Sequence, residues 1–486
     1  MNHDAGRFAL VRQIHSDWLG WLLAILVFAG YTAFSVWQWT NFVAPSWDLG
    51  IFTQLLERYS TASEAIVTIK GPDYNLWGDH FHPILVLLTP LYWLFPSGLT
   101  LMIAQNALFA ISIVPITWLA RSRMGRAGSL IALSYALSWG LANAVAVQFH
   151  EIAFAVPLLA YGLVFYMCGR MWPAMVFVGA IVFVKEDLGL TVAAFGVVAA
   201  VTAWRRRESP MPWLGLNAWG IMWFILAVFV IVPAFNTQGQ WDYTDRVSDA
   251  GLIDQLLAFV TPAQKWMTVG LLILLGGVIA LRSPLILMIV PTLAWRFLGN
   301  VDYYWGWTWH YSAVLMPIVT VAAIDGYERW RAAREQADEA EHAEQTNPPN
   351  QADQPDQRSG RGRAVALAVG VTALASSLFM VGTGPVRHVW HDYYVWDPDG
   401  SRAALAHLEE LGADEQTVVA ADISHLAYLV PHYETYWQGT MDGVVPDAWV
   451  VQLNDPVEDK IAYAHNRWGG TWTAHVHGHV ALLTND

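Results

Sequence analysis

The sequence contains a series of apolar stretches, each near the length of about 20 residues that a helix needs to cross a bilayer. Hydrophobic residues make up 55% of the 486 residues and charged residues only 14%, which is more apolar surface than a soluble fold of this size buries. We therefore predict an all-α polytopic membrane bundle of about eleven transmembrane helices. The stretches are residues 18–36, 99–120, 127–147, 152–168, 171–184, 188–204, 213–234, 266–281, 284–299, 311–323 and 364–381.

Arginine clusters fall between alternate stretches, at residues 7–12, 121–126, 205–207, 329–334 and 358–363. Because cytoplasmic loops of membrane proteins are enriched in Lys and Arg, this pattern predicts a cytoplasmic N-terminus in a bacterial plasma membrane. The segment after the last stretch is then extracytoplasmic. Residues 37–96 form the first external loop, and its apolar piece at 83–95 is too short to span, so we expect interfacial helices there.

Two domains are predicted. Residues 1–383 form the transmembrane domain, in which the Gln-, Asn-, Pro- and Glu-rich stretch 334–363 is expected to be a disordered cytoplasmic linker. Residues 384–486 form a small extracytoplasmic α/β domain, with a helix near 402–411 and strands near 416–421, 448–453 and 479–483.

Several function classes are disfavoured by composition and motifs. The formal net charge of -14 excludes a nucleic-acid partner, because phosphate binding needs a basic surface. The sequence has no G-x-x-x-x-G-K-[ST] loop and no G-x-S-x-G motif, which disfavours ATP-driven transport and serine hydrolysis. The lipid bilayer is the first predicted partner.

Asp48 stands at the start of an amphipathic helix in the first external loop. At about 100° per residue, Leu49, Phe52 and Leu56 share the apolar side of that helix with Asp48. A carboxylate on the membrane side of an interfacial helix suits chemistry on a lipid-borne substrate. The alternative is an acid that only complements the helix N-terminus.

Five polar clusters are predicted to meet at the external edge of the bundle. They are Trp47-Asp48, Gly78-Asp79-His80-Phe81-His82-Pro83, Gln148-Phe149-His150-Glu151, Lys185-Glu186-Asp187, and Arg296 with residues 302–311. Their convergence on one face is the signal, because scattered snorkelling charges have no reason to prefer it. For Trp305, Trp307 and Trp309 in the last cluster, the alternative role is membrane anchoring.

The charged members have alternatives of their own. Lys185, Glu186 and Asp187 lie between two apolar stretches, where ionisable groups usually face a cavity, but a structural Lys–carboxylate pair is the other interpretation. Arg296 either snorkels or binds a lipid phosphate. Asp79, His80 and His82 form a weak alternative metal site; without Cys ligands or an H-E-x-x-H motif, we expect no required cofactor.

The motifs Trp47-Asp48-Leu49-Gly50, residues 78–83, Phe149-His150-Glu151, Val184-Lys185-Glu186-Asp187 and His310-Tyr311 resemble those of an uncharacterised bacterial family of predicted membrane proteins. The plan of one span, a long loop with an early Asp, a bundle and a C-terminal external domain resembles the GT-C superfamily of glycosyltransferases. This resemblance implies a polyprenyl-phosphate sugar as the donor substrate and Asp48 as the catalytic base.

Our leading hypothesis is an integral-membrane glycosyltransferase that moves a sugar from this donor to an envelope glycan, lipid or protein. Asp48 would act as the general base, while Asp79 and Glu151 orient the acceptor or the cations. The donor phosphate would be bound by Lys185, Arg296, His150 and His310. The supporting residues are His80, His82, Glu186, Asp187, Trp305, Trp307 and Trp309.

Two other classes stay open. A transporter or lipid flippase would use the charges at 185–187 and Arg296 as an intramembrane relay, although such proteins usually show related halves and mid-membrane polar groups. A non-catalytic envelope assembly protein would not need these charges at all. The clustering of charges at one surface favours the enzyme.

Overall fold

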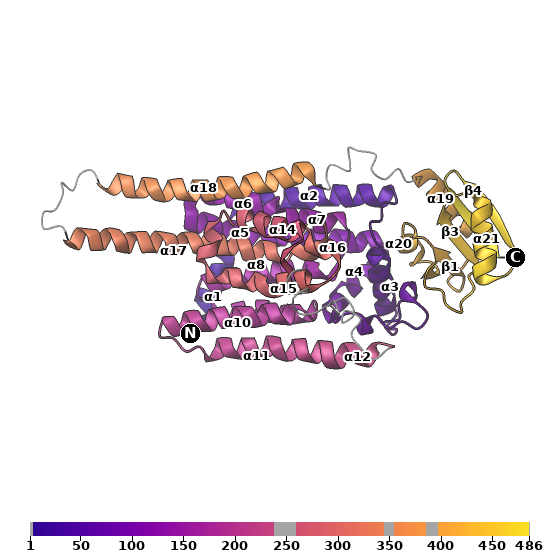
Figure 1. Cartoon of the computed structure of the whole chain (residues 1–486), viewed down its shortest axis with the longest axis horizontal. Coiled ribbons are helices and arrows are strands. Elements are labelled where there is room, and N and C mark those ends of the chain that lie inside the picture. The colour runs from indigo at the N-terminus through magenta and orange to yellow at the C-terminus, as the bar shows by residue number, and fades with distance from the viewer. Residues whose placement is uncertain (1–2, 238–258, 345–353, 385–396, 486) are drawn as a thin grey trace.

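The computed structural model describes residues 3–237, 259–344, 354–384 and 397–485. Long helices run side by side along the longest axis, and a small domain containing the C-terminus lies against one end of this bundle (Figure 1). We call this the domain end and the other the far end. In the first third of the chain the helices are α1 (His3–His15), α2 (Trp18–Thr40), α3 (Asp48–Ser60), α4 (Thr89–Leu94), α5 (Gly98–Met124), α6 (Gly128–Ala136) and α7 (Trp139–Ala146).

α5, α6 and α7 form an antiparallel hairpin packed beside α2. Ser112 and Tyr135 share a hydrogen bond of 2.7 Å between their hydroxyl oxygens, and Gln105 Nε2 donates to the Gln148 carbonyl at 2.9 Å. Polar groups buried in an apolar bundle need such partners, so these bonds fix the register of the two passes. The hairpin delivers residues 148–151 to the domain end.

α10 (Leu188–Arg205) and α11 (Met211–Leu226) form a second close hairpin. A Cβ at Gly196 would lie 2.6 Å from the backbone nitrogen of Asn217, so only glycine allows this approach. Small residues at such contacts let helix backbones pack in an apolar medium. After α11 the chain continues through a π-helix, Ala227–Ile231, into α12 (Val232–Phe235).

The remaining bundle helices complete the layer around α5. They are α8 (Ala155–Met167), α9 (Met171–Gly179), α14 (Ala263–Leu275), α15 (Val290–Leu298), α16 (Asp302–Trp305), α17 (Leu315–Glu344) and α18 (Gln354–Thr383). In the described residues, five helices are long and apolar enough to cross a membrane, or six if the bent pair at 302–340 counts as one, and shorter apolar helices lie among them. The helical membrane bundle is thus as predicted, while eleven crossings stay a prediction.

The prediction of a disordered linker at 334–363 is wrong for its described parts. α17 continues to Glu344 and α18 begins at Gln354, and both project beyond the bundle at the far end (Figure 1). Ala, Glu, Gln and Arg are strong helix formers, so a helix already nucleated by packing continues through a polar sequence. Residues 345–353 lie outside the described residues.

The C-terminal domain is an α/β unit built on a five-stranded sheet of order β2-β1-β3-β5-β4. β1 (Val418–Ala421) pairs in parallel with β2 (Glu434–Trp437) and β3 (Ala448–Gln452), whereas β5 (Val480–Asn485) is antiparallel to β3 and β4 (Trp472–His477). Its helices are α19 (Pro398–Glu410), α20 (Leu426–Leu429) and α21 (Val457–Trp468). β1, β3 and β5 match the predicted strands; β2 and β4 were not predicted. The boundary at residues 383 and 384 stays a prediction, since residues 385–396 are not described.

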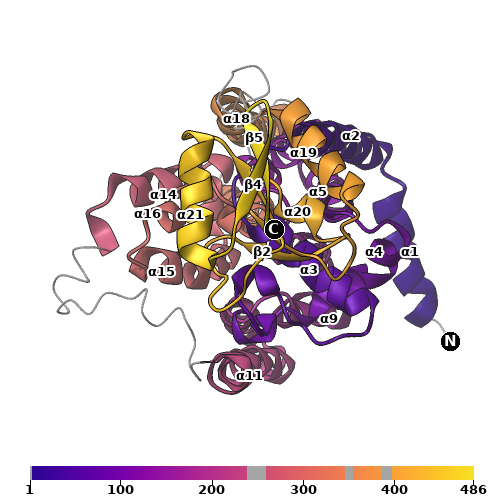
Figure 2. The same ribbon diagram turned by 90° about the vertical axis from the view of Figure 1, so that its right-hand side faces the viewer.

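The C-terminal domain rests on α3, so the expectation that α3 is an interfacial helix is wrong. Seen from the domain end, α20 and the sheet lie in front of α3 (Figure 2), and residues 49–56 of α3 are buried on every face. Its polar side contacts protein instead of water, because Gln54 Nε2 donates to the carbonyl oxygen of Thr435. In contrast, the 3-10 helix Pro83–Leu88 and α4 expose apolar side chains.

Candidate active site

A cavity of about 550 Å³ lies at the domain end of the bundle, where the ends of several helices meet the first loop. It brings together eleven of the fourteen predicted site residues from segments far apart in the sequence. These are Asp48, Asp79, His80, His82, His150, Glu151, Lys185, Glu186, Asp187, Trp309 and His310. The chemical role of each stays a prediction, but their convergence is a feature of the structure.

Asp48 is the first residue of α3 and faces this cavity. Its Oδ2 accepts a hydrogen bond of 2.6 Å from Ser46 Oγ and lies 3.4 Å from His150 Nε2. Burial alone raises the pKa of Asp48, but His150 and Ser46 outweigh it, so the pKa lies below its ordinary value. The carboxylate is therefore ionised at neutral pH, the state that a general base requires.

The other cavity carboxylates are held in pairs between elements. Lys185 Nζ lies 2.9 Å from Glu151 Oε1, which joins the end of one hairpin to the start of α10. Glu186 accepts from His80 Nδ1 at 2.7 Å and from the backbone nitrogen of Phe81 at 3.1 Å. Lys185 is thus paired with a carboxylate while also facing the cavity, and both its structural and its functional interpretation stay predictions.

Several buried polar atoms of the cavity have no hydrogen-bond partner in the described part of the chain. They are Nδ1 of His82, Nε2 of His150, Nδ1 of His310 and Oδ1 of Asp187. The other oxygen of Asp187 accepts from Trp295 Nε1 at 2.9 Å. His310 also stacks on His150, with 3.7 Å between ring centroids. A buried polar group without a partner is costly, so these atoms suit a cavity that receives a polar ligand.

Arg296 is placed differently from its prediction. It is fully buried, with an exposed fraction of 0%, so it does not snorkel. Its guanidinium donates to the carbonyl oxygens of Tyr304 at 2.8 Å and Gly306 at 2.6 Å, and to Ser312 Oγ at 3.1 Å. These bonds brace the 302–312 loop, and Arg296 is not a lining residue of the cavity. We therefore assign it to loop positioning instead of phosphate binding.

The three predicted tryptophans also separate. Trp309 lines the cavity, whereas Trp305 donates its Nε1 to the Gly299 carbonyl and lies under the Lys265 ammonium. Trp307 packs against the bundle core. The sequence could not predict that the three tryptophans point to different places. The chain between 302 and 310 folds as a short helix followed by bends, so the side chains follow no single periodicity.

The weak alternative of a metal site at Asp79, His80 and His82 finds no support in the geometry. Asp79 is bonded to Lys70 and His80 to Glu186, and the described residues contain no group of three such side chains able to hold a metal ion. His82 lines the cavity and belongs to neither of these pairs.

Lys70 is the main lining residue that the sequence analysis missed. Its Nζ lies 2.7 Å from Asp79 Oδ2, and together with His80 it overcomes the effect of burial and lowers the pKa of Asp79 to about 2. The sequence did contain a signal for Lys70, because lysine is rare in this chain. Of its 26 Lys and Arg residues, the lysines are Lys70, Lys185, Lys265 and Lys460. Tyr303, Tyr304, Tyr311 and Trp295 also line the cavity.

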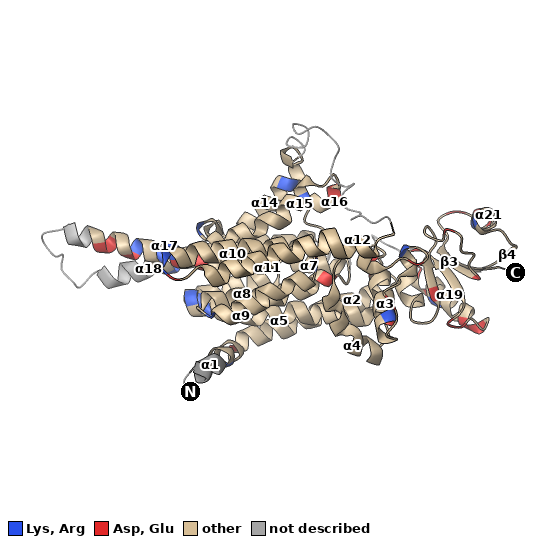
Figure 3. Ribbon diagram, turned by 90° about the horizontal axis from the view of Figure 1, so that it is seen from below, with Lys and Arg blue, Asp and Glu red and all other residues tan. Residues whose placement is uncertain are grey.

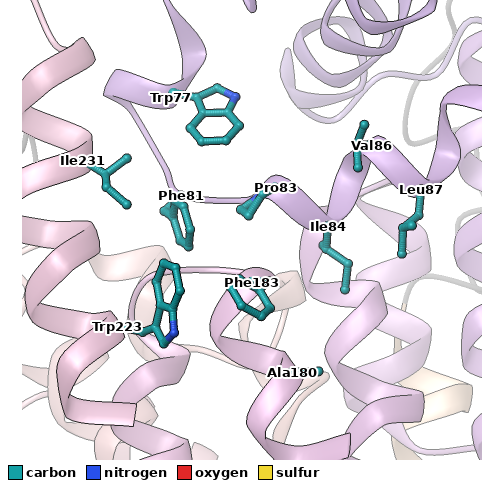
Figure 4. Close-up of a pocket in the computed structure, with 10 residues that line it drawn as sticks. All are labelled: Trp77, Phe81, Pro83, Ile84, Val86, Leu87, Ala180, Phe183, Trp223 and Ile231. Carbon is teal, nitrogen blue, oxygen red and sulfur yellow. The ribbon is translucent and has the colours of Figure 1, made fainter. Parts of the chain in front are cut away.

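An apolar groove of about 640 Å³ lies on the surface of the bundle, and Figure 4 shows the side chains that line it. Residues 77–83 lie between this groove and the cavity, since Asp79, His80 and His82 line the cavity while Trp77, Phe81 and Pro83 line the groove. The groove opens outward, because Val86 and Leu87 at its rim are 53% and 65% exposed. Its other lining residues are Ile84, Ala180, Phe183, Trp223 and Ile231.

Comparison with solved structures identifies the fold of this chain. The crystal structure of ArnT from Cupriavidus metallidurans in the apo state is similar, with a TM-score of 0.51 over 95% of this chain and 98% of ArnT. Sequence identity is 14%, so the likeness shows the fold alone, and that fold is GT-C. The predicted resemblance to the GT-C superfamily is confirmed.

Sequence comparison gives the family. No curated protein matches the chain. The family model of predicted membrane proteins named DUF2079 matches residues 38–343, a range that contains all the polar clusters described above and more than half of the chain. The chain therefore belongs to the DUF2079 family of predicted membrane proteins.

Proposed function

We propose that this protein is a membrane glycosyltransferase that uses a polyprenyl-phosphate sugar as donor. The observation that carries the proposal is the shared wall of residues 77–83, which places a charged cavity beside an apolar groove open to the bundle surface. A molecule with a sugar-phosphate head and a long apolar chain matches both spaces at once, since each space suits the chemistry of one part. The GT-C fold supports the same class of reaction.

The proposed reaction is a displacement at the anomeric carbon of the donor sugar. An acceptor hydroxyl oxygen forms a new bond to the anomeric carbon. At the same time the bond between the anomeric carbon and the phosphate oxygen of the donor breaks. Asp48 takes the hydroxyl proton, and the polyprenyl phosphate leaves with the electron pair. No strong general acid is needed, because a phosphate is a stable leaving group.

Lys185 is the proposed cation for the departing phosphate. Its ammonium has three N–H donors, and the contact with Glu151 uses one of them. A preorganised cation at this place stabilises the charge that develops on the leaving oxygen. Glu151 orients Lys185, and the stacked His150 and His310 supply further polar contacts beside Asp48.

We place this site on the extracytoplasmic side. Arg123, Arg170 and Arg205 lie at the far end of the bundle, at the end of α5, before α9 and at the end of α10, while the bundle between the ends carries little charge (Figure 3). Positive residues mark the cytoplasmic side, so the domain end faces the other way. The acceptor is then a glycan, lipid or protein of the cell envelope.

The test uses purified protein in proteoliposomes, a panel of synthetic polyprenyl-phosphate monosaccharides with labelled sugars, and a cell-envelope fraction as acceptor. We expect one donor to lose its label to the acceptor and to yield polyprenyl phosphate. Lys460→Met, at a surface lysine of α21, is the control that keeps activity. Movement of an intact lipid-linked sugar across the bilayer without its cleavage would instead establish a flippase.

A further inference from the structure

Lys70 reaches the cavity from the tip of a tight loop in the first segment after α3. Residues 66–75 form this loop, closed by a β-bridge between Ile66 and Asn75. The side chain of Lys70 is 15% exposed, and its ammonium lies 4.8 Å from the ring centroid of Tyr74. The hydrogen bond from Lys70 to Asp79 uses one of the three N–H donors of the ammonium, so Lys70 resembles Lys185 in chemistry and pairing.

Both lysines act on the same carboxylate. Burial raises the pKa of Asp79, but His80, Lys70 and Lys185 together reverse this and bring it to about 2. Lys70 and Lys185 both line this cavity, and each is paired with one carboxylate of its wall, Asp79 and Glu151.

The backbone next to Lys70 is held by the C-terminal domain. Thr440 Oγ1 donates to the Ile69 carbonyl oxygen at 2.8 Å, and Gln54 Oε1 accepts from the Ile69 nitrogen at 3.1 Å. Gln54 Nε2 and Thr68 Oγ1 both donate to the Thr435 carbonyl oxygen, at 3.1 Å and 2.7 Å. The two successive peptide groups on either side of the Ile69 Cα are thus both hydrogen-bonded.

This junction is buried and well connected. Gln54, Thr68 and Thr435 are buried, and a fully satisfied buried polar network fixes one geometry because each alternative leaves a group unpaired. Trp437 adds an edge-on contact to Trp47, the residue before Asp48, with 5.1 Å between ring centroids. The C-terminal domain therefore contacts the chain next to Lys70 and next to Asp48.

We propose that Lys70 is a second cation for the donor phosphate, and that Thr440 of the C-terminal domain is the positioning residue that sets it in the cavity. This inference rests on the proposed function and adds a role for the C-terminal domain. The domain forms part of the active site through two hydrogen bonds to the Lys70 loop, between Thr440 and Ile69 and between Thr68 and Thr435. The Thr440 bond is the one at the residue before Lys70, so its loss loosens the position of the ammonium in the cavity.

The test measures binding of geranyl phosphate, a short soluble isoprenoid phosphate, by calorimetry to the full-length protein in nanodiscs, with geraniol as the probe that lacks phosphate. Lys70→Met should weaken geranyl phosphate binding by about 10- to 100-fold, the range for a hydrogen bond to a charged group. Geraniol binding should not change. Lys460→Met is the matched lysine control.

The Thr440 variants test the positioning role. Thr440→Val removes the hydroxyl at constant shape and should weaken geranyl phosphate binding by about 3- to 10-fold, and Thr440→Ser should restore it. Thr484→Val, which removes a hydroxyl that donates to the Thr473 carbonyl at 3.5 Å within the same domain, should bind as the parent does. Thermal unfolding of each variant shows whether the fold is retained.

The outcomes separate the two claims. If the parent does not distinguish geranyl phosphate from geraniol, the proposed donor class fails. If Lys185→Met loses the phosphate preference while Lys70→Met keeps it, the donor class stands and the role of Lys70 is wrong. If Lys70→Met loses it but Thr440→Val does not, the positioning by the C-terminal domain is wrong.

Discussion

Asp48 and Asp422 represent two uses of a partly buried carboxylate in this chain. Asp48 has contacts on one oxygen and faces a cavity, as a reactive group does. Asp422 accepts from His425 Nδ1 at 2.7 Å and from the backbone nitrogens of Ser424 and Gln452, and His425 Nε2 lies 3.0 Å from Ser401 Oγ. The hydrogen-bonded series Asp422, His425 and Ser401 has the order of a hydrolytic triad, but Ser401 and His425 are fully buried and cannot meet a substrate. The series instead connects α19 and the start of α20 to the end of β1.

Asp422→Asn is expected to lower the free energy of unfolding by about 1–3 kcal/mol, because it disturbs the hydrogen bonds of a partly buried charged acceptor. Asp455→Asn, at an exposed site, is the control. Burial raises the pKa of Asp422, but His425 and the amides bring it below its ordinary 3.8. Its contribution is therefore complete above about pH 4 and is lost as pH falls through the lowered pKa. Equal acid stability of variant and parent in thermal unfolding would contradict this role.

At the scale of elements, sequence periodicity predicted where the helices lie in the chain. It predicted less well which of their faces contact solvent, lipid or other parts of the protein. α3 shows the reason: its polar face, with Thr53 and Gln54, has the pattern of a solvated surface, yet it meets the C-terminal domain. One helix cannot reveal a partner almost 400 residues away. The convergence of Asp48, Glu151 and Lys185 was predictable from topology, whereas Lys70 came from a loop whose fold depends on that same partner.

The contact between α10 and α11 offers a matched pair of glycine variants. Gly196→Ala places a methyl group 2.6 Å from the Asn217 backbone and should destabilise the bundle by about 1–3 kcal/mol, the usual cost of overpacking. Gly215→Ala, in α11, meets nothing within 4 Å and should be neutral or slightly stabilising. Thermal unfolding in one detergent compares the two. Equal stability would mean that the hairpin packs less closely than described.

At the scale of the whole molecule, the two ends of the bundle differ both in charge and in what they contain. The far end carries arginines and the exposed tryptophans Trp172 and Trp204, while the cavity and the C-terminal domain occupy the other end (Figures 1 and 3). Tryptophans at such positions anchor helices at a membrane interface. The helical bundle and the small α/β domain were predictable from composition and pattern; their mutual packing was not.

Cysteine labelling checks the proposed orientation in intact cells. In a Cys168→Ser background, a cysteine at Glu415 in the C-terminal domain should react with an impermeant thiol reagent added outside. A cysteine at Ser209, in the exposed turn between α10 and α11 at the far end, should react only after the cells are opened. The reverse pattern would place the candidate site in the cytoplasm.

The most direct test of the account is the rate of sugar transfer by Asp48→Asn. This substitution keeps the size of the side chain and its contact with Ser46 but removes the proton acceptor. We expect transfer to fall by about 10²- to 10⁴-fold, with donor binding and thermal unfolding like those of the parent. An Asp48→Asn protein that transfers sugar at the parental rate would show that Asp48 is not the base and would contradict the proposed mechanism.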